Sequence, residues 1–562
     1  MTERLWTKAP GWSRAQKVAL TDLVDPVAIA LDDEGIIYLV TVDANEEMPG
    51  PSVVALDREA NTLWEQAIET EVNRLDNPNI VWDGELLHVF WIGDNRLYGA
   101  TVDKSGEVVD GPQLLSGQTR VGGHAVDRGP DDALSVWFAG PRRDPGLYAL
   151  PVGDLQGRPM LVDPEGTRPA IKYDQDGMPH VTWVQHLPGS SSARLFYGAY
   201  PFGEYDAELA SEIHTERLAL TSVFSGPFIE LDGESAYVVW SEETRTGSRA
   251  GQAMTHYLAF PMGQPGQQSR PVQVIVPSDH DLEYEYTPEE GLDAGPRVLL
   301  EPGAFGGASG LNRIGTNNNL ANEGVIVSES RINYLFSKTA PQIGLSYFQD
   351  GSPNGYQLIS FTSSASTSPA TISDAEGRLY LTWLERVANE FHVYFASTAP
   401  DIVDNLNSLT LTDTRQLAGD TVFGLLIGAL LTPIALVIWL IIPLAVLLVT
   451  SPMRKEDQTL RSPGTIISLG LAVLAYLVVK TFTLPGIREY VPFSAWLPLP
   501  PWMELPLQII VPLGITLVAL LAAWTFTYRR NNNAPVYFII IFGAADSLMT
   551  MAVYGVIIYN AL

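Results

Sequence analysis

A single phrase recurs along the first four hundred residues and limits what this part of the chain can fold into. Each clear copy has a proline, a short apolar run, an acidic turn ending in glycine, and a second apolar run closed by a tryptophan. Pro169 precedes Trp183 by 14 residues, and Pro369 precedes Trp383 by the same 14. Such acidic-glycine turns supply the positive φ angle that tight hairpins need, and alternation along the second run places the tryptophan on a buried face. Each copy therefore predicts a β-hairpin closed by a buried aromatic side chain.

Alignment on the closing residue gives seven copies with a nearly regular period. The spacings between successive closing residues are 51, 46, 46, 57, 96 and 47. A period in the forties to fifties with several short strands per unit is typical of a β-propeller. We predict an all-β propeller of about seven four-stranded blades, with six or eight as the alternatives. The closing residues, which we interpret as structural blade anchors with no catalytic role, are Val40, Trp91, Trp137, Trp183, Trp240, Phe336 and Trp383.

The gap of 96 residues covers about two periods, so an eighth blade has to be considered. Residues 279–321 in this gap lack an anchor tryptophan and are rich in turn-forming residues. We therefore predict that this stretch is an insertion over one face of the propeller. The N-terminal segment KVALTDL resembles the fourth strands of the repeats, and we expect it to help close the ring.

The phrase P-x-I-x-x-D-x-x-G-x-x-H-V-x-W at 169–183 resembles the sialidase-like, BNR-type propellers of bacteria. The resemblance covers about residues 20–417, and it implies the fold without the catalytic motifs. Gly177 stands six residues before Trp183, which is too far for the aspartate box of that family, and the Arg-Ile-Pro motif of working sialidases does not occur. Arg142-Arg143 is the one basic doublet before residue 419, and we interpret it as a solvated loop.

Composition excludes several classes of function. Residues 419–562 hold seven of the 34 basic and six of the 64 acidic residues, which leaves 27 and 58 in 1–418, a formal charge of −31. Such a surface repels nucleic acid. The chain has no cysteine, so disulfides and thiolate metal sites are excluded. The eight histidines are scattered along the chain. We interpret the acidic stretch 279–290 as a solvated loop in preference to a Ca²⁺ site. We predict no catalytic, cofactor-binding or metal-binding residue, and no cofactor.

The last quarter of the chain holds four apolar segments, approximately 422–449, 465–482, 507–527 and 536–558. Each is long enough to cross the hydrocarbon core of a bilayer as a helix. We therefore predict two domains, a propeller over 1–418 and a four-helix transmembrane domain over 419–562. Pro433 and Pro443 are expected to kink the first helix.

Basic residues near the ends of these helices predict an orientation. One side carries Arg454, Lys455, Arg461, Arg529 and Arg530, and the other carries Arg415, Lys480 and Arg488. The richer side is expected to be cytoplasmic, which puts the propeller, the 483–506 loop and the C-terminus outside. The first residues, MTERLWTKAPGW, do not form a signal peptide. Either a leader has been lost from this sequence or the propeller is cytoplasmic, and we favour the first.

Asp546 is an acidic residue inside the fourth apolar segment, where a carboxylate is costly unless it is paired, protonated or in water. One interpretation is a proton- or ion-linked site. The other, which we favour, is that Asp546 lies near a helix end or is hydrogen-bonded by Ser547 or Thr550.

These features predict a membrane-anchored β-propeller that acts as an extracytoplasmic binding or scaffold protein of the cell envelope and is not an enzyme. Its expected partners are the lipid bilayer and membrane or envelope proteins, with a glycan as a possible ligand and no nucleic acid. The alternatives are a membrane-bound glycan hydrolase of sialidase-like type and a transport-associated subunit that uses Asp546.

Overall fold

The structure is a computed structural model, and it divides into two compact units, Met1–Ser408 and Leu409–Leu562. It describes residues 4–5, 8–21, 27–43, 50–129, 132, 134–151, 153–186, 191–200, 205, 209–219, 221–247, 250–278, 282, 284, 292, 295–300, 308–316, 323–334, 338–362, 364–387, 390–450, 462–484, 490–493, 501–529 and 534–561.

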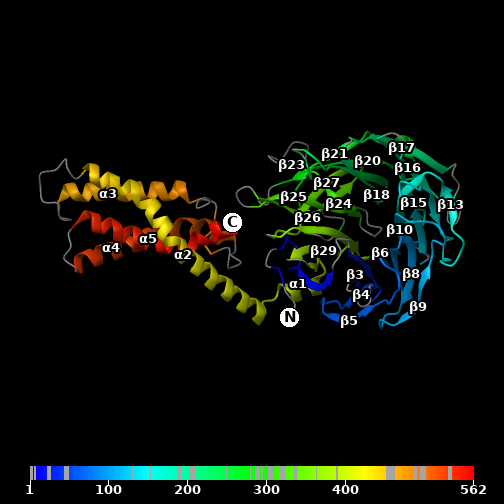
Figure 1. Cartoon of the computed structure of the whole chain (residues 1–562), viewed down its shortest axis with the longest axis horizontal. Coiled ribbons are helices and arrows are strands. Elements are labelled where there is room, and N and C mark those ends of the chain that lie inside the picture. Colours follow the sequence, from blue (N-terminus) through cyan, green and yellow to red (C-terminus); the bar gives the residue numbers. More distant parts are fainter. Residues whose placement is uncertain are drawn as a thin grey trace. The chain divides into compact units, whose positions relative to one another are not determined.

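Seven four-stranded antiparallel sheets make up the first unit over its described residues, which confirms the predicted seven-bladed propeller (Figure 1). Within each sheet the strands follow one another in chain order, except in the last. The first four sheets are β2 (Ala28–Leu31), β3 (Ile37–Asp43), β4 (Gly50–Leu56), β5 (Thr62–Ala67); β6 (Asp76–Trp82), β7 (Leu87–Gly93), β8 (Arg96–Val102), β9 (Val108–Leu114); β10 (Gly123–Arg128), β11 (Leu134–Ala139), β12 (Leu147–Ala149), β13 (Met160–Asp163); and β14 (Gly166–Tyr173), β15 (Pro179–His186), β16 (Ser192–Ala199), β17 (Ala210–Arg217). The other three are β18 (Ser222–Leu231), β19 (Ser235–Thr244), β20 (Ala253–Pro261), β21 (Val272–Val274); β24 (Asn312–Thr316), β25 (Gly324–Tyr334), β26 (Lys338–Gln349), β27 (Ser352–Leu358); and β28 (Ser366–Ser373), β29 (Leu379–Val387), β30 (Glu390–Ser397), β1 (Gln16–Thr21).

The sheets form a closed ring. The first strand of each sheet contacts the first strand of the next, from β2 through β6, β10, β14, β18, β24 and β28 and back to β2, so these seven strands surround a central axis. In the seventh sheet the N-terminal strand β1 pairs with β30 as the outermost strand. The predicted role of the N-terminal segment in closing the ring is therefore confirmed.

Four of the tryptophans occupy one equivalent position. Trp91, Trp183, Trp240 and Trp383 lie in second strands, are at most 1% exposed, and pack in clusters with the preceding sheet. Each ring also lies over the side chain paired with it in the third strand, as between Trp183 and Phe196, whose centroids are 5.6 Å apart. These side chains fill the space between blades.

Trp137 differs from these four, because Phe138 takes the equivalent position in the third sheet. Phe138 stacks on Tyr148 of the third strand with centroids 5.4 Å apart, and it packs with the second sheet. Trp137 is fully buried but packs with the fourth sheet. Trp137 stands one residue before the equivalent position and pairs with Ala125, whereas Phe138 pairs with His124. Alignment on the tryptophan is therefore shifted by one residue in this sheet, which exchanges the two faces.

The first and sixth sheets place small polar residues at this position. Thr41 stands three residues after Tyr38, as Trp91, Trp240 and Trp383 do after the corresponding aromatic residues, whereas Val40 packs with the second sheet. In the sixth sheet Ser328 pairs with Gly344, and Tyr356 from the fourth strand fills the space. A Cβ on Gly344 would lie 2.4 Å from the Tyr356 hydroxyl oxygen, so the glycine is required there. Phe336 lies outside the described residues.

The expected insertion at 279–321 is only partly a loop. Its residues 312–316 form β24, the first strand of the sixth sheet, and Ala308–Ser309 (β23) pairs with Val276–Pro277 (β22). Arg297 is fully buried with its guanidinium 3.5 Å from the centre of the Tyr347 ring, and its Nη2 donates to Glu323 Oε2 at 2.9 Å. Part of this stretch therefore belongs to the core of the propeller.

The second unit consists of α2 (Leu411–Thr450), α3 (Pro463–Thr483), α4 (Glu504–Arg529) and α5 (Pro535–Ala561), while α1 (Pro400–Asn407) belongs to the first. Among the described residues, four stretches are long and apolar enough to cross a membrane: Thr421–Thr450, Pro463–Thr483, Glu504–Arg529 and Pro535–Gly555. α5 packs against α2 and α4. A Cβ on Gly428 would lie 2.1 Å from the carbonyl oxygen of Met551, so the backbones of α2 and α5 approach closely. These helices confirm the predicted helical region that follows the propeller.

Candidate functional site

The turn aspartates of the repeat lie at one end of the propeller axis, where first strands lead into second strands. Asp374 Oδ1 accepts the backbone N–H groups of Glu376 at 3.1 Å and Arg378 at 2.9 Å, and its Oδ2 accepts the Tyr380 hydroxyl at 2.9 Å. The same arrangement joins Asp32 to Tyr38, Asp83 to His88, Asp174 to His180 and Asp232 to Tyr237. Each carboxylate thus stabilises its own hairpin, which is a structural role.

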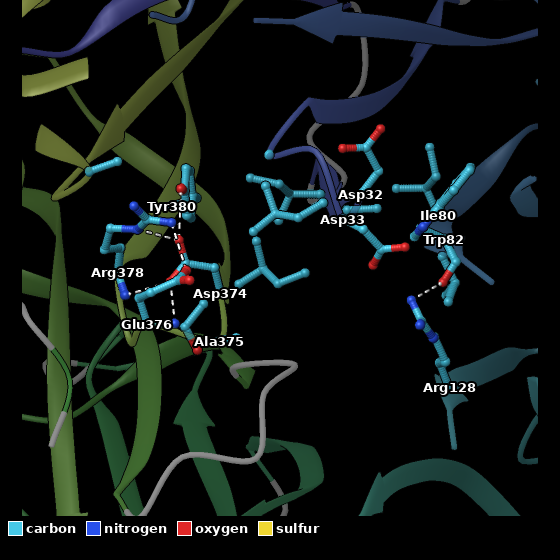
Figure 2. Close-up of a pocket in the computed structure, with 18 of the residues that line it drawn as sticks. Asp32, Asp33, Ile80, Trp82, Arg128, Asp374, Ala375, Glu376, Arg378 and Tyr380 are labelled. Atoms are coloured by element: carbon cyan, nitrogen blue, oxygen red, sulfur yellow. Dashed lines mark hydrogen bonds and ion pairs between the residues drawn. The ribbon is translucent and has the colours of Figure 1, made fainter. Parts of the chain in front are cut away.

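A pocket of about 770 Å³ opens at this end of the axis. It is lined by residues of the first, second, third, fourth and seventh sheets and of α1. Figure 2 shows two sides of it, with Asp374, Glu376, Arg378 and Tyr380 on one, and Asp32, Asp33, Trp82 and Arg128 on the other. The volume falls within the range of sites that enclose small ligands.

A chain of charges runs along one wall of the axis. Asp127, Lys172 and Glu230 lie on β10, β14 and β18, at the position two residues before the hairpin turn. Lys172 Nζ lies 4.0 Å from Glu230 Oε2, with the two side chains 4% and 1% exposed. The first, second and seventh sheets carry Ala30, Val81 and Ile372 at this position. Three consecutive blades therefore carry a charged side chain at a position where three other blades carry a small or apolar one.

Asp127 is a buried carboxyl in the wall of the pocket. Burial raises the pKa of Asp127, and Lys172 together with the backbone N–H groups of Arg128 and Tyr173 offsets that shift only in part. Its Oδ2 accepts the Tyr173 N–H at 3.0 Å. A buried carboxyl with a raised pKa, next to a lysine and a pocket, can bind a ligand hydroxyl or exchange a proton with it.

The rim of the pocket carries both signs of charge. Arg378 pairs with Asp374 at 2.5 Å and with Glu376 at 2.7 Å. Arg128 pairs with Asp132, and its Nη1 donates to the carbonyl oxygen of Trp82 at 3.0 Å. These ion pairs hold the rim side chains in place around the opening.

Metal binding receives no support from this geometry. Over the described part of the chain, no group of three or more His, Cys, Asp or Glu side chains is placed to hold a metal ion. The carboxylates of the rim are occupied by arginines and by backbone N–H groups. The site is suited to an organic ligand with several polar groups.

The predicted anchors that lie within the described residues are buried in the sheets and do not line this pocket, and Asp546 lies in the second unit. Asp546 Oδ2 accepts the Lys480 ammonium at 2.7 Å and the Thr550 hydroxyl at 3.3 Å, and the carboxylate is fully buried. The expected bond from Thr550 is present, but the pairing with Lys480 was not predicted. One signal was available, since each is the only ionisable side chain of the Asp, Glu, Lys or Arg types in its helix.

The sequence analysis also missed Asp127 and Lys172. Both stand where other repeats have a small or apolar residue, so comparison of the repeats position by position, instead of by their closing aromatic residues, would have found them.

No protein-family model and no curated protein sequence matches the chain. Among solved structures, an ulvan lyase, which is a polysaccharide lyase, is similar over 73% of this chain and 100% of its own, with 10% identity and a TM-score of 0.42. The β-propeller domain of the Trilobed protease from Pyrococcus furiosus covers 67% of this chain and 94% of its own, with 9% identity and a TM-score of 0.35. An endo-1,4-beta-xylanase from Bacteroides thetaiotaomicron covers 61% and 96%, with 11% identity and a TM-score of 0.30. These similarities are weak and carry no argument about function.

Proposed function

We propose that this protein is a membrane-anchored binding protein that holds an extracytoplasmic ligand in the axial pocket of its propeller. The observation that carries the proposal is the pocket of about 770 Å³ whose wall contains Asp127 and Lys172. Polar groups that converge from five blades and α1 on one concave site are the usual form of a small-molecule site. The ligand is expected to be rich in hydroxyl groups or to carry both charges, because the pocket offers carboxylates, guanidiniums and an ammonium.

The binding test uses the full chain in lipid nanodiscs, screened against a glycan library and a small-molecule library by thermal shift. A bound compound is expected to lose at least tenfold in affinity in Asp127→Asn and in Lys172→Met, because each removes a charge-assisted contact. Arg194→Gln on β16 of the fourth blade is the matched control, since Arg194 pairs with Glu212 outside the pocket. Equal weakening in the control would count against the pocket as the binding site.

The extracytoplasmic placement of the propeller has its own test. Lys480 lies inside the helical unit and is no loop charge, which leaves five basic residues on the proposed cytoplasmic side against Arg415 and Arg488 on the other. Because the chain has no cysteine, Ser105→Cys on the propeller and Arg529→Cys at the end of α4 give single labelling sites. On intact cells, a membrane-impermeant maleimide is expected to label Ser105→Cys only. Labelling of Arg529→Cys alone would place the propeller in the cytoplasm.

A second candidate function is hydrolysis of a glycan, and the direction of the Asp127 pKa shift favours it, since a general acid works better with a pKa above that of an ordinary carboxyl. Turnover of a bound glycan, detected as new reducing ends and abolished by Asp127→Asn, would establish this alternative. Binding without turnover supports the first proposal.

A further inference from the structure

The opposite end of the axis holds a group of basic side chains in an otherwise acidic unit. β14 runs from Gly166 to Tyr173, with Lys172 and Tyr173 at the axial pocket and Arg168 near its other end. Arg168 and Lys172 are four positions apart, which corresponds to about 13 Å along a strand. Arg168 therefore lies at a separate place from the site described above.

Arg168 occupies a backbone position that most residues avoid. It has φ of 53° within the bulge where β14 shifts register against β15. The same bulge in the fifth blade has Gly226, with φ of 102°, which adopts such a conformation without strain. The equivalent bulges of the second, sixth and seventh blades carry Asn77, Arg313 and Ser368, also with positive φ, so this bulge accepts a side chain, and in the fourth blade that side chain is an arginine.

Contacts hold Arg168 and His186 around one aromatic ring. Arg168 Nη1 donates to the carbonyl oxygen of Phe224, and the guanidinium lies 6.0 Å from the centre of the Phe224 ring. The His186 ring meets Phe224 edge-on, with centroids 6.3 Å apart. His186 Nδ1 is buried without a hydrogen-bond partner in the described part of the structure.

Arg142 lies in a short loop of the third blade, and its charge acts on both His186 and Arg168. The loop is closed by a hydrogen bond from the N–H of Gly140 to the carbonyl oxygen of Gly146 at 2.9 Å. The N–H of Gly146 in turn donates to the carbonyl oxygen of Gly166 at 3.0 Å, which fixes the loop to the start of β14.

The three basic groups repel one another. Burial, then Arg142 and Arg168, lowers the pKa of His186 to about 4, and burial, then Arg142, lowers the pKa of Arg168. Arg194 shows the opposite case, because its hydrogen bond with Glu212 raises its pKa. Within the described residues, no ion pair joins Arg142 or Arg168 to a carboxylate. A bound anion would relieve this repulsion.

We propose that Arg142, Arg168 and His186 form an anion-binding site that takes a carboxylate or sulfate group. Guanidiniums bind both groups through paired, charge-assisted hydrogen bonds. A free anion and an acidic glycan both supply such a group, and the two sources share this chemistry. The site is independent of the axial pocket, so either can be right without the other.

The test measures thermal unfolding of the full chain in nanodiscs with sodium sulfate or sodium D-glucuronate, at an ionic strength held constant with sodium chloride. The expected result is a rise in the unfolding temperature of the wild type. Arg168→Gln and Arg142→Gln should each weaken apparent binding about tenfold, and Arg143→Gln, the neighbouring arginine, should leave it unchanged. Arg142 is exposed, so its variant is informative even if Arg168→Gln folds poorly.

A second measurement follows the imidazole of His186 by NMR with labelled histidine, assigned with His186→Gln. Anion binding should raise the pKa of His186, because the anion offsets the two guanidiniums. A tetrasaccharide of uronic acid and its neutral, carboxyl-reduced form separate the sources: tighter binding of the acidic form than of free glucuronate identifies a glycan, and equal binding identifies the free anion. An unchanged pKa, or equal loss of binding in Arg143→Gln, would overturn the proposal.

Discussion

Lys172 of the propeller and Lys480 of the helical unit are buried to the same extent, with each side chain 4% exposed. Lys480 makes a direct bond of 2.7 Å to Asp546 and has the Trp439 ring 6.0 Å away. Lys172 lies 4.0 Å from Glu230, interacts electrostatically with Asp127, and lines a pocket. In the apolar helices the charge is neutralised by one short pair, whereas in the propeller it is left within reach of a ligand.

The largest expected effect is on the helical unit. Lys480→Met leaves the carboxylate of Asp546 buried without its cation, which should lower the free energy of unfolding by about 3 to 5 kcal/mol. The double variant Lys480→Met/Asp546→Leu removes both charges and should recover most of this loss. Helical circular dichroism during thermal unfolding in nanodiscs measures both. A double variant no more stable than the single one would show that the pair is not the source of the effect.

The next effect concerns His124, a buried side chain that stays neutral, whereas Lys480 is charged and paired. Burial lowers the pKa of His124 to about 4. Above pH 6.5 the imidazole is neutral in both states, and as the pH falls the unfolded chain gains a proton that the folded protein does not bind. Stability should therefore fall by about 3 kcal/mol between pH 6.5 and 4. Urea unfolding followed by tryptophan fluorescence should show this dependence reduced in His124→Gln and retained in His214→Gln.

A smaller loss is expected at the pocket. Lys172→Met should lower the free energy of unfolding by roughly 2 kcal/mol at pH 7, below the cost of opening a tight buried pair. Removal of the ammonium raises the pKa of Asp127 in the folded protein further. The folded state of the variant is then less favourable to the ionised carboxylate, so its loss in free energy of unfolding relative to the wild type should grow as the pH rises from 4 to 7. Lys172→Arg keeps the charge and serves as the control. A deficit independent of pH would mean that lost packing, and not charge, is responsible.

The smallest effect is expected at the rim. Arg378 is 34% exposed, and Arg378→Ala should cost no more than about 1 kcal/mol despite its two ion pairs. Screening by 1 M salt should reduce this difference further, whereas the effect of Lys480→Met should stay. A similar salt dependence for both would remove the distinction between exposed and enclosed pairs.

The sequence predicts the fold well because local sequence patterns determine the hairpins of the blades. Turn aspartates, alternating strands and tryptophans at 183, 240 and 383 each fix a hairpin, and long apolar runs predict the helices. The predictions fail where one blade departs from the pattern. In the third blade Phe138 takes the anchor position and the tryptophan stands one residue earlier, and in the sixth blade Tyr356 fills the space from a different strand.

The candidate sites could be predicted much less well, because each joins residues from different repeats. Lys172 and Glu230 are 58 positions apart, and Lys480 and Asp546 are 66 apart. A single sequence indicates such pairs only through the register of the repeats in the propeller and through lone charged residues in the apolar helices. The bulge that contains Arg168 could not be predicted either, because the shift of register between Thr167 and Ala170 is a property of the backbone pairing.

Closure of the ring by β1 also determines when this protein can finish folding during its synthesis. The outermost strand of the seventh sheet is made first, and its partner β30 ends at Ser397. At roughly 5 to 20 residues per second, β1 waits about 20 to 80 s for that partner. Throughout this time its edge is open to pairing with other chains. A chaperone that covers residues 16–21 until translation passes Ser397 would therefore protect the nascent chain at its most exposed point.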